Sequence, residues 1–333
     1  RHVMSRDIDT RAVIKNAWRI TARRNLSCLR IRVPAGHLAA RHLELIRTIA
    51  EQFGNGTVHL TSRQGFEIPA IPYDRMPEVN RLLTPFIGDV EGGLGIPIEN
   101  AGAGYPAAGM RNISACIGNR VCPYANVDTT SLAQKLEAIL YPNHYHVKVA
   151  VTGCPNDCAK AHLQDFGIIG ICEPELESGR CIGCEACAKT CRKKVTGAIS
   201  MHNFRPRRDP LLCIGCGECV LACPVNAWSR VPKAFYRLLI MGRTGKRNPR
   251  LAAPFIDAIE EAPLLQVLRN CFSYIDPNID KTLPKEHVGY IVDRTGYPAF
   301  RETVLKGVTL NPQAIVAESL TFAGYRPAPL RRP

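Results

Sequence analysis

The sequence contains no apolar run that approaches the roughly 18 residues a membrane-spanning helix needs. Its first twenty residues carry seven charged side chains and no apolar core, so we expect no secretory leader there. Aromatic residues are scarce, at 7% with two tryptophans, and no stacking platform for nucleic acid is visible. These absences predict a cytoplasmic protein without a membrane span.

Cysteine and positive charge are abundant instead. The 333 residues include 15 cysteines, which is too few for a disulfide scaffold. In a reducing compartment such thiols are metal ligands or core residues. Lysine and arginine total 43 against 29 aspartate and glutamate, giving a net charge of +14. An excess of this size predicts an anionic partner: nucleic acid, phospholipid, a polyanionic cofactor or an anionic substrate.

Composition and periodicity divide the chain into four segments. Residues 1–88 mix strand and helix patterns, and a glycine-rich stretch opens the segment 89–178. Residues 179–230 hold eight cysteines, many glycines and prolines, and few large aliphatic residues. Residues 231–333 return to strand and helix patterns. The sequence therefore predicts an α+β protein with a small inserted module.

Hydrophobic periodicity also places individual elements. The predicted strands cover 29–33, 58–60, 66–68, 146–151, 166–171 and 234–241. The predicted helices cover 37–53, 77–86, 129–140, 264–274 and 300–308.

Two cysteine runs in the inserted module share the spacing C-x2-C-x2-C-x3-C. This spacing is typical of two-cluster ferredoxins, in which each 4Fe-4S cluster takes its fourth thiolate from the other run. The alternative, a pair of zinc knuckles, has no use for a doubled run of four cysteines. The predicted ligands of the first cluster are Cys181, Cys184, Cys187 and Cys223. The predicted ligands of the second cluster are Cys213, Cys216, Cys219 and Cys191.

Two further cysteine pairs supply the ligands of a third predicted cluster. Cys116 and Cys122 are spaced C-x5-C, and Cys154 and Cys158 lie in the segment G-C-P-N-D-C. The C-x3-C spacing predicts that both thiols face one side of a helical turn that begins at Pro155. The alternative is four buried core cysteines. The remaining thiols, which we expect to be inert and buried, are Cys28, Cys172 and Cys271.

The C-x5-C pair followed by G-C-P-N-D-C resembles the sirohaem and 4Fe-4S centre of the sulfite and nitrite reductase family. Further segments that resemble the family are 29–36 (LRIRVPAG), 60–66 (LTSRQGF), 111–112 (RN) and 242–250 (GRTGKRNPR). The resemblance covers nearly the whole chain. It implies a sulfite-reductase-type half, made of a ferredoxin-like small domain plus a sirohaem-binding α/β domain, with an inserted ferredoxin module that carries two 4Fe-4S clusters.

The resemblance assigns the substrate anion to four residues. Arg30 and Arg111 match the substrate-binding arginines of the family, and Lys148 matches a substrate-binding lysine. His146 stands where relatives often have another lysine, and on the predicted strand it shares one face with Lys148. The alternative for Lys148 is a solvated cation on the strand, and the alternative for His146 is an ordinary core or surface histidine.

The resemblance also assigns residues to sirohaem. Arg32 and Arg63 become clamps on its carboxylates, although arginines in such positions also form ordinary ion pairs. Cys158 becomes both a cluster ligand and the axial ligand of the sirohaem iron. The other implied sirohaem-binding residues are Asn156, Arg243, Lys246 and Arg250.

The implied function is the six-electron reduction of sulfite to sulfide by a catalytic subunit with sirohaem and three 4Fe-4S clusters. The glycines between 92 and 104 lack the context of a dinucleotide site, so iron–sulfur and flavin/NADH donor subunits are expected to supply electrons. The basic residues at 192–194 and 205–208 form either a solvated loop or a docking site for an acidic donor subunit. Relatives have two similar halves and this chain has one, so we expect a homo-oligomer or a heteromeric complex.

Three alternatives remain open at this stage. A sirohaem nitrite reductase of the same architecture fits the same residues. A non-catalytic polyferredoxin carrier explains the module but not the arginines. A nucleic-acid enzyme is suggested only by the charge, and no recognition motif supports it.

Overall fold

The computed structural model of the chain describes residues 17–98, 100–106, 109–245, 249–283 and 286–323. The chain forms two compact units, which are described separately. Unit 1 comprises Arg1–Ser114, Ala133–Lys148 and Lys281–His287, and unit 2 comprises Ala115–Leu132, Val149–Asp280 and Val288–Pro333. The predicted segment 1–88 belongs to unit 1 and the predicted module 179–230 to unit 2; the four-segment division itself stays a prediction.

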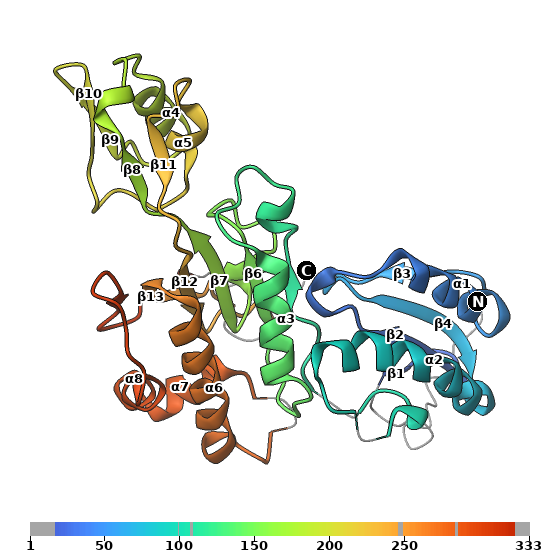
Figure 1. Cartoon of the computed structure of the whole chain (residues 1–333). Helices are drawn as coiled ribbons and strands as arrows, with labels where there is room; N and C mark the ends of the chain where they lie inside the picture. The colour runs from blue at the N-terminus through green and yellow to red at the C-terminus, as the bar shows by residue number, and fades with distance from the viewer. Residues whose placement is uncertain (1–16, 99, 107–108, 246–248, 284–285, 324–333) are drawn as a thin grey trace, which may run out of the picture. The chain divides into compact units, whose positions relative to one another are not determined.

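Unit 1 is built on a four-stranded antiparallel sheet with the strand order β1-β2-β4-β3 (Figure 1). Its elements are β1 (Trp18–Ile20), β2 (Leu26–Ile31), α1 (Leu43–Gln52), β3 (His59–Leu60), β4 (Phe66–Pro72) and α2 (Met76–Val90). Ile49 of α1 and Leu83 of α2 share one buried core with Leu29 of β2. Because alternate residues of β2 point into this core, Arg30 lies on the other face of the strand.

Unit 2 contains a six-stranded sheet with the order β14-β13-β12-β7-β6-β5. Its strands are β5 (Ser114–Ala115), β6 (Val149–Thr152), β7 (Phe166–Ile171), β12 (Phe235–Ile240), β13 (Ala253–Ile259) and β14 (Ile315–Val316). β6 and β7 pair in parallel, whereas β7, β12, β13 and β14 pair antiparallel. All six residues of β7 are buried, which is why this strand is a continuous apolar run without alternation.

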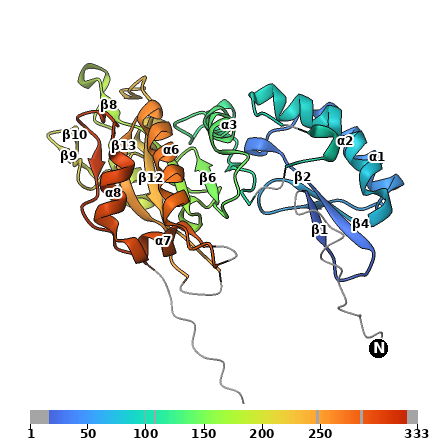
Figure 2. The ribbon, with the colours of Figure 1, turned by 90° about the horizontal axis from the view of Figure 1, so that it is seen from below.

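Three C-terminal helices pack together in unit 2 (Figure 2). They are α6 (Glu261–Asn278), α7 (Val288–Thr295) and α8 (Tyr297–Leu305). Phe300 of α8 lies edge-on to Tyr274 of α6, with 5.2 Å between ring centroids, and 5.8 Å from Phe255 of β13. These aromatic contacts join the helices to the sheet. Within the described ranges, no helix is both long and apolar enough to cross a membrane.

The cysteine-rich module is a small substructure of unit 2. Its elements are β8 (Pro174–Leu176), α4 (Ala186–Lys194), β9 (Ile199–His202), β10 (Arg205–Arg208), α5 (Glu218–Ala222) and β11 (Trp228–Arg230). β9 pairs with β10 and β8 pairs with β11. Gly183 and Gly215 adopt positive φ angles of 70° and 67°, so each cysteine loop turns tightly before its helix.

Several predicted elements are confirmed. The predicted helix 129–140 is α3 (Thr129–Leu140), and the predicted strand 166–171 is β7. The strand predicted at 234–241 is β12, one residue shorter at each end. The helix predicted at 264–274 is the centre of α6.

Three predictions need correction. The helix predicted from 37 begins only at Leu43, because short 3-10 turns occupy Pro34–Gly36 and Ala40–His42. The strand predicted from 146 begins at Val149. Before it, the Gly109 N–H donates to the Asn143 carbonyl at 2.8 Å, which joins this part of the chain to another segment. Residues 154–158 form turns rather than a helical turn. His146 and Lys148 therefore precede the strand and do not share a strand face.

Candidate functional site

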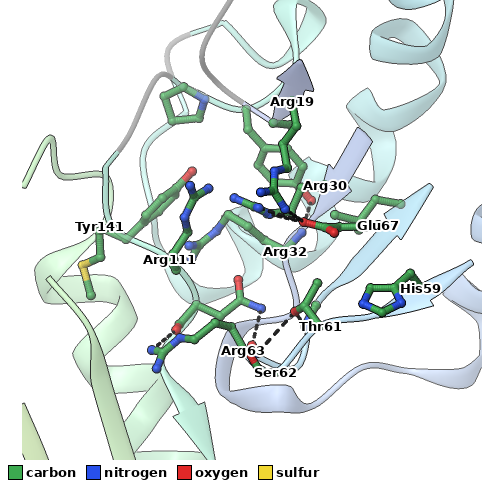
Figure 3. A pocket seen from close by; sticks show the side chains of 17 residues that line it. Arg19, Arg30, Arg32, His59, Thr61, Ser62, Arg63, Glu67, Arg111 and Tyr141 are labelled. Carbon is green, nitrogen blue, oxygen red and sulfur yellow. Dashed lines mark hydrogen bonds and ion pairs between the residues drawn. The ribbon is translucent and has the colours of Figure 1, made fainter. Parts of the chain in front are cut away.

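Unit 1 contains a cavity of about 260 Å³ that is lined mainly by cationic and polar side chains (Figure 3). Its arginines are Arg19, Arg30, Arg32, Arg63 and Arg111. Glu67 is the single carboxylate among the lining residues. The five guanidinium groups outnumber Glu67 and the two buried glutamates that pair with Arg32, so the cavity keeps an excess of positive charge and suits a small anion or carboxylate groups.

Glu67 of β4 joins two of these arginines. Its Oε1 accepts hydrogen bonds from Arg30 Nη2 at 2.7 Å and from Arg19 Nη1 at 2.6 Å. Burial alone would raise the pKa of Glu67, but the hydrogen bonds and charges of Arg30 and Arg19 outweigh it and hold the pKa below its ordinary value. Arg30 therefore lines the cavity, and its assignment to the substrate anion, which would compete with Glu67 for it, stays a prediction.

Arg32 is held more tightly than the sequence suggested. It is only 6% exposed, and its Nε and Nη2 donate to Glu91 Oε1 at 2.8 Å and to Glu137 Oε2 at 2.7 Å. Tyr141 lies against its guanidinium, 3.4 Å from ring centroid to Cζ. Its Nη1 is buried without a hydrogen-bond partner in the described part of the chain. Nη1 is the nitrogen that Arg32 can offer to a ligand, because Nε and Nη2 already donate to the two glutamates.

The two glutamates that form salt bridges with Arg32 were not predicted. Glu91 and Glu137 are both fully buried. Burial raises the pKa of Glu137, and the charge of Arg32 offsets this only in part. The sequence did contain a signal, since Glu137 falls in the buried stripe of α3 between Leu136 and Leu140. An acidic residue in an apolar stripe needs a partner.

Arg63 comes from the turn between β3 and β4. Thr61 Oγ1 accepts the backbone N–H groups of Arg63 and Gly65 at 3.3 and 3.0 Å, which fixes the turn. Arg63 Nη2 donates to the Asn112 carbonyl at 2.6 Å, and Asn112 Nδ2 returns a hydrogen bond to the Arg63 carbonyl at 3.2 Å. These bonds hold Arg63 next to the segment that carries Arg111 (Figure 3).

Lys148 and His146 are not among the residues that line the cavity. Both are half-buried residues of unit 1. The imidazole of His146 packs edge-on against His287, with 5.0 Å between ring centroids. Their assignment to the substrate stays a prediction.

Unit 2 gathers the four cysteines of the predicted third cluster. Burial is the largest cause that raises the pKa of the Cys154 thiol, and the nearby thiols of Cys158, Cys116 and Cys122 raise it further. The Gly153 N–H points at Cys116 Sγ, 3.1 Å away. Four thiols within electrostatic range and a backbone donor aimed at one sulfur fit a cubane cluster, whose sulfur ligands accept such hydrogen bonds. Asn156 and Cys158 are exposed.

The module brings together the predicted second-cluster thiols. Burial raises the pKa of Cys216, as do the thiols of Cys213 and Cys191. The pKa of Cys219 is raised to about 12, first by burial and then by the thiols of Cys172, Cys216 and Cys213. Cys191, from the other run, therefore lies near Cys216, Cys172 lies near Cys219, and the assignment of Cys191 to this cluster stays a prediction.

The predicted first-cluster thiols come from a loop and from helix ends: Cys181 and Cys184 lie in the loop before α4, Cys187 in its first turn, and Cys223 directly after α5. Cys187 and Cys184 are within electrostatic range of each other. Cys223 Sγ accepts the Ala227 N–H at 3.1 Å, and although burial raises its pKa, several backbone N–H groups outweigh this and lower it. No three Cys, His, Asp or Glu side chains within the described residues are close enough to hold a single metal ion.

The late arginines form a separate group in unit 2. Arg243 and Arg250 pair through their backbones and both contact Asp293 of α7, at 3.3 and 3.0 Å. Tyr290 stacks on Arg243 and Phe322 on Arg250. Lys246 lies outside the described residues. The assignment of these residues to sirohaem stays a prediction.

The gathered thiols and the arginine-lined cavity suit an iron–sulfur oxidoreductase that acts on a small anion. A family profile described as "Nitrite and sulphite reductase 4Fe-4S domain" matches residues 107–310. A second, "Nitrite/Sulfite reductase ferredoxin-like half domain", matches residues 19–86. The chain therefore belongs to the nitrite and sulfite reductase family, as the sequence resemblance predicted.

Individual relatives agree with this membership. The chain is 42% identical over 322 residues to a subunit of the anaerobic sulfite reductase of Salmonella typhimurium, covering 96% of each protein. It is 32% identical over 183 residues to the "Coenzyme F420-dependent sulfite reductase" of Methanocaldococcus jannaschii, covering 53% of this chain and 27% of that protein. Among solved structures, dissimilatory sulfite reductase I matches with a TM-score of 0.64 and 18% identity, over 92% of this chain and 73% of the other. At that identity the match shows the fold alone.

Proposed function

We propose that this chain is the catalytic subunit of a sulfite reductase that reduces sulfite to sulfide at a sirohaem coupled to a 4Fe-4S cluster. The observation that carries the proposal is the quartet Cys116, Cys122, Cys154 and Cys158, which the fold gathers from two distant sequence segments. The 42% identity to a protein named as part of an anaerobic sulfite reductase supports sulfite as the substrate.

The arginines would perform the anion chemistry. Arg30 and Arg111 would bind the oxygens of sulfite, together with Lys148 and His146. Arg63 and the Nη1 of Arg32 would hold carboxylates of sirohaem, because a guanidinium matches a carboxylate in shape and charge. When bound, sirohaem and its cluster would pass electrons to the substrate, and Cys158 would help to hold both groups. Asn156, Arg243, Lys246 and Arg250 would complete the sirohaem site.

Two further 4Fe-4S clusters in the module 179–230 would deliver electrons. The module carries eight lysines and arginines against three aspartates and glutamates between residues 179 and 228. Ile182 and Phe204 are 66% and 79% exposed, and Phe204 lies against Gly183 in the first cysteine loop. An apolar centre next to basic residues suits the docking of an acidic iron–sulfur or flavin/NADH donor subunit in the cytoplasm. We therefore propose that the chain works in a heteromeric complex, or as a homo-oligomer that supplies the second half.

The first test is a spectrum of the anaerobically purified protein, with iron and labile sulfide counted on the same sample. About twelve cluster irons plus one haem iron, with a reduced-porphyrin band in the red, are expected. About eight irons without that band would instead identify a ferredoxin-like carrier. Sulfite turnover with reduced methyl viologen follows, comparing Arg111→Gln with the exposed control Arg41→Gln. A loss confined to Arg111→Gln is expected, and equal activity of both would contradict the anion site.

Nitrite reduction is the second candidate. The matching family includes nitrite reductases, and the chain is 29% identical over 150 residues to "Ferredoxin--nitrite reductase" of Synechococcus elongatus. That match covers 44% of this chain and 26% of that protein. Steady-state rates with each anion under one reductant distinguish the two substrates, and a higher kcat/KM for nitrite would reverse our assignment.

A further inference from the structure

Asn126 connects the inserted module to the cysteine quartet within unit 2. It lies four residues after Cys122 in the loop that leads to α3. Its Nδ2 donates to the carbonyl of Gly215, 89 residues away, at 3.2 Å. Its own backbone N–H donates to the carbonyl of Gly153 at 2.7 Å. One residue thus bonds to two loops that are distant in sequence.

Both of those loops carry predicted cluster ligands. Gly215 lies between Cys213 and Cys216 of the module. Gly153 directly precedes Cys154, and its N–H points at Cys116 Sγ at 3.1 Å. A continuous run of covalent and hydrogen bonds therefore leads from the Cys213 loop through Asn126 and Gly153 to a sulfur of the quartet. We call this run the Asn126 connection.

The orientation of the Asn126 amide is fixed from several sides. Its Oδ1 accepts Arg230 Nε at 2.9 Å, and its Nδ2 also approaches the Gly170 carbonyl at 3.4 Å. The donor on one side and the carbonyls on the other define which amide atom is nitrogen. A Cβ at Gly217 would lie only 2.9 Å from Asn126 Oδ1, so the loop backbone of the module approaches this amide closely. The amide of this half-buried residue is therefore fixed in place by its hydrogen bonds.

We propose that Asn126 is the positioning residue that couples the module's second cluster to the sirohaem-linked cluster. This inference rests on the proposed function, because it requires metal clusters at both sets of thiols. It also assigns the order of transfer: the set Cys191, Cys213, Cys216 and Cys219 hands electrons directly to the quartet. The set with Cys181 and Cys184 is then the more distant point of entry.

Each transfer moves one electron and makes or breaks no bond. The reduced cluster at the module thiols is oxidised, and the cluster at the quartet is reduced by the same electron. The source of the electron in the test is dithionite. Hydrogen bonds couple donor and acceptor orbitals better than a gap between side chains, so removal of the Asn126 amide lowers the rate without altering the driving force.

The test uses the holoprotein with two variants and a matched control. Asn126→Leu keeps the size of the side chain and removes all its hydrogen bonds. Asn126→Asp keeps an acceptor for Arg230 and removes the donor to Gly215, so it serves if the leucine variant does not fold. The control is Asn311→Leu, since Asn311 Nδ2 also donates to a backbone carbonyl of unit 2, that of Ala258, at 2.8 Å.

The measurement is freeze-quench electron paramagnetic resonance after mixing oxidised protein with a single electron equivalent of dithionite. In Asn126→Leu we expect electron passage from module to quartet to slow by roughly tenfold to a hundredfold, the usual loss for an outer-shell partner of a metal site. Iron content and midpoint potentials are expected to stay at wild-type values, and Asn311→Leu is expected to transfer normally.

Unchanged transfer in a variant with full iron content would overturn the proposal. So would a slowdown that the midpoint potentials fully explain, because Asn126 would then tune a cluster rather than connect two. Wild-type protein that lacks cluster iron would contradict the proposed function and the connection together. Full iron with equal rates contradicts the connection alone.

Discussion

Glu137 accepts a hydrogen bond from Arg32 Nη2 at its Oε2, at 2.7 Å, and another from the Ile113 N–H at its Oε1, at 2.6 Å. One buried carboxylate thereby orders both a cavity arginine and the backbone two residues after Arg111. The buried carboxylates that position Arg32, those of Glu91 and Glu137, are not among the residues that line the cavity. This arrangement makes the stability of unit 1 sensitive to single substitutions beneath the cavity.

Arg32→Met is expected to be strongly destabilising. It leaves Glu91 and Glu137 buried without their cation, and breaking a buried pair in this way costs about 3–5 kcal/mol. In a unit of this size that lowers the Tm by roughly ten degrees, measured by differential scanning fluorimetry. Adding Glu137→Gln should recover part of the loss. The exposed control Arg47→Met should leave the Tm nearly unchanged, and an equal loss in both would refute the buried network.

Glu67 is expected to make the Tm of the protein more sensitive to acid. Arg30 and Arg19 lower the pKa of Glu67 in the folded protein. Its contribution to the free energy of unfolding is therefore complete above the pKa of the unfolded state, and it is lost as the pH falls through the pKa of the folded state. Between about pH 6 and pH 3 the wild type should therefore lose more Tm than Glu67→Gln. The raised pKa of Glu137 acts in the opposite direction but is common to both proteins. Parallel Tm curves would contradict the prediction.

Cys191 and Cys172 can be told apart by iron analysis, although both lie near the same thiols of the module. The run spacing selects Cys191 as the fourth ligand, so Cys191→Ala should lose about four irons. Cys172→Ala should retain its iron, because the backbone N–H of Cys172, which donates to Gly215 at 2.9 Å, is unchanged. The reverse result would make Cys172 the ligand.

The docking proposal predicts a difference between protein and small-molecule donors. Phe204→Ser and Arg207→Glu should each raise the KM for an acidic ferredoxin donor by roughly tenfold. The dependence of this KM on salt concentration should fall more in Arg207→Glu than in Phe204→Ser, because only Arg207→Glu removes a charge from the docking surface. Turnover with reduced methyl viologen should stay at the wild-type rate, because this donor needs no docking surface. Arg47→Glu, a charge reversal in unit 1, is the control. A matching loss with methyl viologen would place the defect in the module rather than in docking.

The cysteine sets could be predicted from spacing because cluster ligands must follow a loop geometry that fixes their separation, and their assignment to clusters stays a prediction. The strand 166–171 and the helix 129–140 were equally readable, since burial on both faces and an amphipathic stripe leave clear patterns. The bounds near His146 were not readable. Three residues earlier the Asn143 carbonyl accepts the N–H groups of Gly109 and Met110, and such long-range pairing leaves no local signal.

The cavity shows the same division. Arg30, Arg63 and Arg111 were identified by resemblance, and the structure places all three around one cavity. The contacts that restrain them, Glu67 on Arg30 and Asn112 on Arg63, depend on strand register and loop closure. Asn126 was missed for the same reason, because its partner Gly215 is 89 residues away.

The five-arginine cavity has a consequence for biogenesis. The guanidinium groups around about 260 Å³ outnumber the carboxylates that pair with them and repel each other, and under the proposed function a polyanionic cofactor would relieve that repulsion only in the folded chain. Binding that is confined to the folded state raises stability by mass action. The amount of intact protein in a cell should therefore follow the supply of tetrapyrrole, and starvation for that precursor should expose newly made chains to proteolysis.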